Sequence, residues 1–466
     1  MRRGRGHGLP VPGSRGSPEE SDPADPAPAV SRRQVLGGLG LAGAGAALGG
    51  VAGVAGGAAI GGSAGAAAAP LSSSTVPFYG RHQAGIITPV QDRLVFATFD
   101  VVDGTDADGL RGLLARWGDA AAKLATGQLV GEDDDPEAPP LDTGEAVGSP
   151  VSNLTVTIGY GPSLFDSRFG LASKRPAQLV DLPALPNEDL DPAYTGGDLC
   201  IQACSGDPLV AFHAVRNLAR LGTGVVALSW MELGFGKTST TSTAEATPRN
   251  LLGFKDGTRN VKAQDTDLVD RYVWVGRESD QAWLHGGSYL VARRIRIFIE
   301  NWDRAFLGDQ QKVIGRAKTN GAPLSGGTEF TTPDFGAQND QGQPVIPAHA
   351  HIRLASHEEN GGLRLLRRGY SYTDGIDPVL GTLLGGLFFI AFMKDPNQFI
   401  TLQQKLGTDD ALNEYVQHTG SALFACPPGI APGEHWGDEL FSTGACPPVP
   451  AEGQEAWLWM AGSPVQ

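Results

Sequence analysis

The order of the predicted elements indicates an α+β sandwich of ferredoxin-like type. A strand–helix–strand pattern occurs twice between residues 94 and 233, and the chain after residue 250 shows a similar order of elements. With 466 residues and 41% hydrophobic side chains, the chain can bury a sizeable core. We divide it into a leader over residues 1–69 and two halves over residues 70–247 and 248–466.

The first half is predicted to hold four strands and two helices. Residues 94–101 alternate and are rich in Val and Phe, which is typical of a strand. Residues 106–124 place apolar side chains at helical spacing. The remaining elements are strands over 154–159, 198–204 and 225–233 and a helix over 208–221. The acidic, Pro-rich segment 132–150 and the Ser/Thr-rich segment 238–247 are predicted loops.

The second half opens with a strand over residues 289–300, where apolar and polar side chains alternate. The Gly/Pro/Asn-rich segment 320–349 is a long excursion, and such loops are often functional. The apolar run 379–393 is too short and too interrupted by Gly to span a membrane. The other predicted elements are helices over 302–316, 398–406 and 409–418 and strands over 363–371 and 386–392.

The first 69 residues have the pattern of an export signal. Arg32 and Arg33 precede a weakly apolar Gly/Ala run that ends in Ala66–Ala69. This pattern predicts a twin-arginine signal cleaved near Ala69, and therefore an extracytoplasmic protein in the cell envelope or secreted. The alternative is a membrane anchor, because the run is long enough to span a bilayer, but its Gly/Ala content provides little apolar driving force.

The net charge and the cysteine spacing argue against two classes of ligand, nucleic acid and zinc. The formal net charge is −15 and no Lys/Arg-rich tract occurs, which argues against a nucleic-acid partner. In an exported protein the four cysteines can form disulfides. Cys426 and Cys446, each followed by Pro-Pro, are the favoured pair, while Cys200 and Cys204 can be small core residues. Neither pair has the spacing of a zinc site.

Three short motifs carry the chemistry: Gly-Phe-Lys-Asp-Gly-Thr over 253–258, His-Ile-Arg over 351–353 and Leu-Arg-Arg-Gly-Tyr-Ser over 366–371. Alone, each has a plainer interpretation, namely a turn, a structural histidine and a solvated surface. Together they supply a carboxylate, an imidazole and a guanidinium. A haem peroxidase needs this set, as a proton carrier, an iron ligand and a cation that stabilises departing charge.

These motifs, together with Phe78–Ile86, Leu154–Asp166 and Gly286–Ile295, resemble the dye-decolorising peroxidase family, and most closely its exported branch of deferrochelatase-type peroxidases. The resemblance covers essentially the whole chain after residue 69. It implies two ferredoxin-like halves, each with an antiparallel sheet flanked by helices, and haem b with its single iron in the C-terminal half. It also implies hydrogen peroxide and a small-molecule electron donor as substrates.

The resemblance assigns roles to individual residues. His351 matches the proximal iron ligand, and His349, two residues earlier, is its local competitor. Asp256 matches the distal acid and Arg367 the distal cation, which also contacts the haem. Further haem-lining residues are expected at Gly257, Thr258 and Arg259.

Two further expectations concern the surroundings of the haem. Asp395 is expected to accept a hydrogen bond from the proximal histidine, although an ordinary turn is the alternative for this residue. The exported branch often has Asn-Pro-Arg after His-Ile-Arg-Leu-Ala, whereas this chain has Ser-His-Glu over 356–358. The arginine that would meet a haem propionate is therefore missing, and Arg353 or Arg259 is expected to replace it.

The implied chemistry is reduction of peroxide. Asp256 would move a proton between the peroxide oxygens, and Arg367 would stabilise charge as the O–O bond breaks. A carboxylate in this role favours activity in mild acid. We therefore expect oxidation of bulky donors such as dyes or phenolics. The alternative is release of iron from haem with the porphyrin intact, with partners in an iron-uptake system. A non-catalytic haem carrier is a weaker alternative, since storage needs no Asp–Arg pair. A homo-oligomer, in its simplest form a dimer, is also expected.

Overall fold

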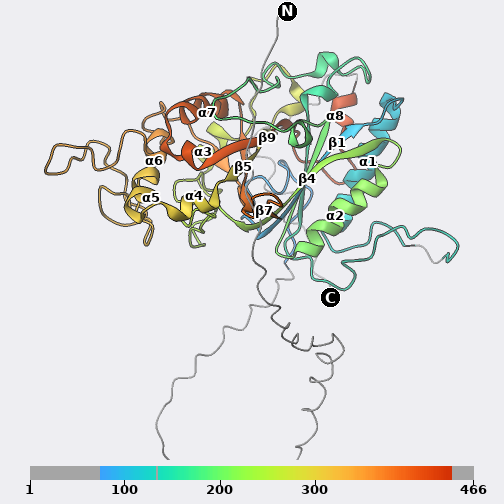
Figure 1. Cartoon of the computed structure of the whole chain (residues 1–466). Helices are drawn as coiled ribbons and strands as arrows, with labels where there is room; N and C mark the ends of the chain where they lie inside the picture. Colours follow the sequence, from blue (N-terminus) through green and yellow to red (C-terminus); the bar gives the residue numbers. More distant parts are fainter. Residues whose placement is uncertain (1–73, 133–134, 443–466) are drawn as a thin grey trace, which may run out of the picture. The chain divides into compact units, whose positions relative to one another are not determined.

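A computed structural model of the chain describes residues 74–132 and 135–442, which belong to one compact unit (Figure 1). The predicted export signal and Cys446 lie outside the described residues. Cys426 is buried and is a free thiol in this structure, as are Cys200 and Cys204. The Cys426–Cys446 disulfide therefore stays a prediction, while burial of Cys200 and Cys204 agrees with a core role.

The described residues form nine strands, eight α-helices and five short 3-10 helices. The strands are β1 Arg93–Val101, β2 Thr155–Tyr160, β3 Leu199–Ser205, β4 Val226–Lys237, β5 Ser288–Ile297, β6 Leu366–Arg367, β7 Tyr370–Ile376, β8 Leu383–Met393 and β9 Val416–Cys426. The helices are α1 Ala107–Leu124, α2 Pro208–Leu221, α3 Thr266–Tyr272, α4 Ile299–Arg304, α5 Leu307–Ile314, α6 His351–Leu354, α7 Asn397–Asp409 and α8 Asp438–Phe441. The 3-10 helices are η1 Pro162–Leu164, η2 Ala172–Lys174, η3 Pro192–Tyr194, η4 Ala282–Leu284 and η5 Ala411–Glu414.

Strand order confirms the predicted fold class. In the first half the order is β4-β1-β3-β2, and in the second half it is β7-β8-β5-β9, with all these pairs antiparallel. In each half the first strand therefore lies between the last and the third, which is the ferredoxin-like arrangement. Figure 1 shows α1 and α2 beside the strands of the first half and α3 to α7 beside those of the second.

The two half-sheets also join at both edges, which the sequence analysis did not anticipate. β2 meets β9 where Tyr160 pairs with Ala425, and β4 meets β7 where Phe235 pairs with Ser371. Since β5 also pairs with β8, eight strands form a closed ring and only β6 lies outside it. Edge pairing satisfies backbone groups that open sheets would expose. In the part of the chain that is described, no helix has both the length and the apolar character to cross a membrane.

Alternation along the strands sends side chains to two separate cores. Phe96 on β1 and Phe388 on β8 belong to a cluster inside the ring, and Val95 belongs to a cluster that includes the apolar faces of α1 and α2. On β8, Leu387 and Phe389 point to the opposite side from Phe388 and line a cavity outside the ring. Most of β8 is thus covered on both faces, which positions the cavity directly on the sheet.

Two predicted helices are wrong. Residues 302–316 form two helices, α4 and α5, because the chain extends at Phe306, and the buried Gln310 amide donates to the Trp302 and Ala305 carbonyls at the break. Residues 409–418 contain η5 and the start of β9. β9 lies between β5 and β2 and is buried on both faces, so its sequence lacks the polar alternation that marks a half-buried strand.

A buried ion pair crosses the inside of the ring and connects the two halves. Arg294 on β5 donates to Glu232 on β4 at 2.9 Å, and also pairs with Asp374 on β7. Its guanidinium lies over the rings of Tyr194 and Tyr372, 4.4 and 4.3 Å from their centroids. Burial raises the pKa of Glu232 from 4.5 to about 7, although the charge of Arg294 opposes the shift.

Replacing Glu232 with glutamine is expected to make the stability of the protein depend less on pH between pH 4.5 and pH 8. The folded state holds a proton on Glu232 up to about pH 7, whereas the unfolded state releases it near pH 4.5. Wild-type stability therefore falls as pH rises through this window, by up to about 3 kcal/mol, and glutamine cannot ionise. Urea unfolding at both pH values measures the difference. Glu137→Gln, in an exposed loop, controls for loss of one charge, and an equal effect of Glu232→Gln at both pH values would contradict the expectation.

Candidate active site

The main cavity lies between the outer face of the second-half sheet and α7, and its lining residues all fall between Asn250 and His418. It contains about 1750 Å³ of empty space, counted with its opening to solvent. Apolar side chains from the sheet and α7 form much of its wall: Ile295, Ile297, Leu387, Phe389, Phe399, Leu402 and Leu406. The predicted residues Asp256, Gly257, Thr258, Arg259, His351 and Arg367 all line this cavity. The structure thus brings together the three sequence motifs.

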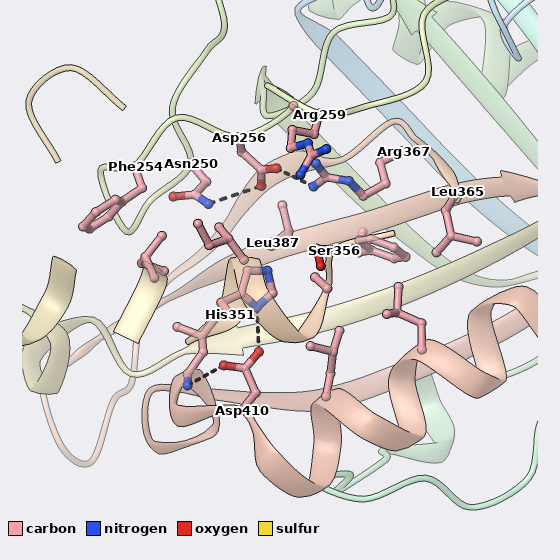
Figure 2. Close-up of a pocket in the computed structure, with 18 of the residues that line it drawn as sticks. Asn250, Phe254, Asp256, Arg259, His351, Ser356, Leu365, Arg367, Leu387 and Asp410 are labelled. Atoms are coloured by element: carbon pink, nitrogen blue, oxygen red, sulfur yellow. Dashed lines mark hydrogen bonds and ion pairs between the residues drawn. The ribbon is translucent and has the colours of Figure 1, made fainter. Parts of the chain in front are cut away.

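His351 projects into the cavity from the first turn of α6 (Figure 2). The preceding residue, Ala350, is extended, so the turn of α6 begins at the histidine itself. Gly315, with φ of +90°, ends α5 against this turn, and a Cβ at Gly315 would lie 2.6 Å from Cγ1 of Ile352. Glycine is therefore needed there for the close approach that fixes α6. The His351 side chain is 35% exposed, and this exposed part faces the cavity.

Asp410, rather than the predicted Asp395, is the hydrogen-bond partner of His351. Nδ1 of His351 lies 2.6 Å from Oδ2 of Asp410, whose side chain is only 4% exposed. Oδ1 of Asp410 accepts from the backbone N–H of Leu412 at 2.9 Å, which fixes the carboxylate. Burial opposes protonation of His351, but the charge of Asp410 outweighs it, and the pKa of His351 is raised. A carboxylate on Nδ1 leaves the Nε2 lone pair facing the cavity.

The expectation for Asp395 is wrong because this residue lies at the other end of α7. Its Oδ1 accepts from the backbone N–H of Asn397 at 2.9 Å, at the first turn of the helix. Asp410 follows the last residue of α7. A helix of 13 residues is about 20 Å long, so only one of these two acids can reach the imidazole. Asp395 therefore belongs to an ordinary turn at the start of α7, which was the alternative interpretation of this residue.

Replacing Asp410 with asparagine is expected to weaken the His351 ligand field without unfolding the site. Asparagine keeps the size of the side chain and can still accept from Leu412, but it removes the negative charge next to Nδ1. Haem affinity should fall about tenfold or more, and the ferric/ferrous midpoint potential should rise. Spectroscopic redox titration measures the potential. Asp395→Asn is the matched control, and an equal change in that variant would restore Asp395 to the role.

Asp256 and Arg367 lie across the cavity from His351, as Figure 2 shows. Nη1 of Arg367 donates to Oδ1 of Asp256, and the Asn250 amide donates to Oδ2 at 3.3 Å. The sequence analysis did not single out Asn250, which lies three residues before the Gly-Phe-Lys-Asp-Gly-Thr motif. The two side chains are partly buried, 14% exposed for Asp256 and 29% for Arg367. A carboxylate and a guanidinium thus face the free imidazole nitrogen over an apolar floor.

Backbone contacts hold both members of this pair in place. The Asn260 amide accepts from the N–H of Arg367 and donates to its C=O, each at 2.8 Å. The N–H of Asp256 donates to the Pro248 carbonyl at 2.9 Å. Gly257 follows with φ of +104°, and a Cβ there would lie 2.9 Å from the backbone nitrogen of Thr240. The glycine of the Asp-Gly motif is therefore required by close packing of two backbones.

The other imidazoles near the cavity differ from His351 in their contacts. His349 does not line the cavity, and its Nδ1 contacts the Asp409 carbonyl. His418 accepts from Arg293 at Nδ1 and contacts Gln403 at Nε2, and burial lowers its pKa to about 3. Nδ1 of His357 lies 3.1 Å from Glu358, and burial together with the charge of Arg364 lowers the pKa of this ring, whereas Asp410 raises the pKa of His351 despite its burial. Among the cavity-lining histidines, His351 is the best placed to bind a metal.

The two arginines expected to replace the missing propionate ligand have different positions. Arg353 does not line the cavity, and its guanidinium donates to the carbonyls of Phe335 and Ile346, which do not line it either. The expectation for Arg353 is therefore wrong. Arg259 does line the cavity, but both its terminal nitrogens contact the Glu358 carboxylate.

Comparison with known proteins identifies the family. Two sequence models match: Dyp-type peroxidase, N-terminal, over residues 83–236, and Dyp-type peroxidase, C-terminal, over residues 247–431. The chain belongs to the Dyp-type peroxidase family. Relatives of this peroxidase include the deferrochelatase of Yersinia pseudotuberculosis, 38% identical over 421 residues, which are 89% of this chain and 95% of the relative. The deferrochelatase of Escherichia coli K12 is 39% identical over 361 residues, 76% of this chain and 84% of the relative.

Solved structures agree with the assignment. The oxyferrous/water mixed complex of DtpA from Streptomyces lividans has a TM-score of 0.74 at 39% identity, and the match covers 80% of this chain and 99% of that chain. A DyP-type peroxidase from Streptomyces coelicolor has the same TM-score and identity, with 80% and 98% covered. The likeness to Rhodococcus jostii DypB, at 20% identity and a TM-score of 0.53, shows the fold alone. The predicted family and fold are confirmed, and this peroxidase is a haem-dependent enzyme.

The residues of the cavity fit a haem. A single imidazole directs a free nitrogen into an apolar space, and its other nitrogen is held by a carboxylate, which is a common arrangement around metal-bound histidines. The apolar side chains that β5 and β8 contribute to the lining suit contact with a porphyrin face. His351 would hold the iron, and the apolar side chains of β8 and α7 would contact the ring. When bound, the haem supplies the redox chemistry of the peroxidase.

Proposed function

We propose that this peroxidase uses hydrogen peroxide to oxidise bulky organic donors such as dyes or phenolics, with His351 as the iron ligand and Asp256 and Arg367 as the groups that act on peroxide. One observation carries the proposal. The free Nε2 of His351 faces an Asp–Arg pair across an apolar cavity. A carrier protein would need only the imidazole and the apolar walls, so the pair argues for turnover.

The roles of the two groups follow from their contacts. Asp256 can accept a proton from peroxide and return it to the leaving oxygen, since only one of its oxygens contacts Arg367 and the Asn250 contact to the other is long. Arg367 stabilises negative charge as the O–O bond breaks, because Asn260 fixes its backbone and its guanidinium lies at the cavity beside Asp256. Asp410 keeps His351 oriented throughout.

Release of iron from haem with an intact porphyrin is the second candidate. The relatives named deferrochelatase, at 38% and 39% identity, favour it. This function uses the same cavity and the same histidine, so the difference lies in the product. Protein components of an iron-uptake system would then be partners.

One experiment separates these functions. The absorption spectrum of the haem-loaded protein is recorded before and after one equivalent of hydrogen peroxide, and a dye is then added. A histidine-ligated ferric spectrum that changes quickly and returns with the dye supports peroxidase turnover. Fluorescence of free protoporphyrin supports iron release. A haem spectrum that is unaffected by peroxide would overturn the peroxidase proposal.

We also propose that the protein is exported by the twin-arginine pathway and acts outside the cytoplasm as a homodimer. The twin arginines and the Ala-rich end of the leader support export. N-terminal sequencing of the secreted or envelope fraction tests cleavage near Ala69, and light scattering tests the dimer. A protein found only in the cytoplasm with its leader intact would contradict the export proposal.

A further inference from the structure

Five cationic side chains line the cavity, and four are already held by protein groups. Lys255 pairs with Glu329, Arg259 with Glu358 and Arg367 with Asp256, while Arg316 donates to the carbonyls of Gly321 and Glu329. The fifth, Arg364, has no hydrogen bond or ion pair from its guanidinium to any residue in the described ranges. A partly buried cation in a ligand cavity without a counter-charge is a candidate for binding an anionic group of the ligand.

The chain holds Arg364 firmly at this place. It follows Gly361 and Gly362, which have φ of +62° and +87°, and its own carbonyl accepts from the Gln398 amide of α7 at 2.8 Å. Leu363 and Leu365 on either side of it also line the cavity. The backbone is thus fixed to the helix that forms one wall, while the guanidinium stays available.

Arg364 lies beside the Ser-His-Glu segment, where the family often has an arginine. Both Arg364 and His357 line the cavity, and burial and then the charge of Arg364 lower the pKa of His357. The carboxylate of Glu358 does not repel a second anion here, because it is neutralised by Arg259 and contacts Nδ1 of His357. The neighbourhood therefore has a net positive charge, with Arg364 as its unpaired member.

We propose that Arg364 binds a carboxylate of the ligand in this cavity, namely a propionate of haem. The planar guanidinium of arginine can donate two parallel hydrogen bonds to one carboxylate. The ammonium group of lysine carries the same charge but lacks this paired geometry. Arg364 thereby takes the role of the arginine that the Ser-His-Glu segment lacks. The two residues first expected in this role are less suitable, because Arg353 lies outside the cavity and Arg259 is paired with Glu358. The inference rests on the proposed haem cavity.

The test compares haem with haem dimethyl ester, in which both carboxylates are blocked. Full-length wild type, Arg364→Gln and Arg364→Lys are titrated with each compound by Soret absorbance, and loss of haem to excess apomyoglobin is followed in parallel. Arg364→Gln should bind haem about tenfold to a hundredfold more weakly, with its affinity for the ester unchanged. The haem affinity of Arg364→Lys should lie between those of wild type and Arg364→Gln, because lysine keeps the positive charge but cannot donate two parallel hydrogen bonds. Arg111→Gln, a surface arginine in the first half, is the control.

The outcomes are distinct. Equal losses for haem and ester in Arg364→Gln indicate a structural role and overturn the inference, as does no loss for either. If haem binding is unchanged but KM rises for an anionic dye and not for a neutral phenol, the anion belongs to the electron donor, and the cofactor assignment is wrong. A wild-type protein that binds no haem overturns the proposed function itself, whereas normal wild-type binding with no effect of Arg364→Gln overturns only this inference.

Discussion

Replacing His351 with alanine is expected to abolish stable haem binding. Its Nδ1 is held by Asp410, which leaves its Nε2 free toward the cavity. Of the other cavity-lining imidazoles, His418 has both nitrogens in contact with Arg293 and Gln403, and His357 has its Nδ1 in contact with Glu358. Without an axial ligand, the apolar walls provide only non-specific contact. Haem content after purification and the Soret position measure the loss.

Two controls make the His351 prediction sharper. His349→Ala removes the neighbouring imidazole, which lies outside the cavity, and should keep normal haem content. Free imidazole added to His351→Ala should restore part of the binding, because the deleted ring leaves a space of its own shape next to Asp410. A normal ferric spectrum in His351→Ala, combined with haem loss in His349→Ala, would move the ligand to His349.

Replacing Arg367 with leucine should slow the reaction with hydrogen peroxide by about 10²–10³-fold while haem binding persists. The guanidinium is the cation closest to Asp256, and its backbone is fixed at both N–H and C=O by Asn260. Leucine fills similar space but cannot stabilise charge on the leaving oxygen. Stopped-flow absorbance at several peroxide concentrations gives the second-order rate constant.

The matched control for charge is Arg259→Leu, since this arginine lines the same cavity but is paired with Glu358. Its peroxide rate should change far less than that of Arg367→Leu. Asp256→Asn tests the proton carrier separately and should lower turnover with the guanidinium still present. An unchanged peroxide rate in Arg367→Leu would remove this residue from the chemistry, and full turnover in Asp256→Asn would make Asp256 a turn residue.

Helices and strands could be predicted from the sequence where one face of the element is exposed to solvent, because apolar and polar side chains then recur with a clear period. Helix α2 was predicted with its observed bounds, because Asp207 and Pro208 mark its start and Gly222 its end. Strand β9 was missed, because burial on both faces removes the alternation that identifies a strand. The closure of the two half-sheets into a ring depends on edges far apart in the sequence, as between Tyr160 and Ala425.

The sequence by itself determined the fold class, the family and the cavity residues within the three motifs, because each motif holds its chemistry within a few neighbouring positions. Tertiary structure decided which distant groups complete the site. Asp410 rather than Asp395 reaches His351, since the two acids lie at opposite ends of α7. Arg364 rather than Arg353 is available in the cavity, since α6 turns Arg353 away. Such pairings depend on helix length and direction, which local sequence patterns do not encode.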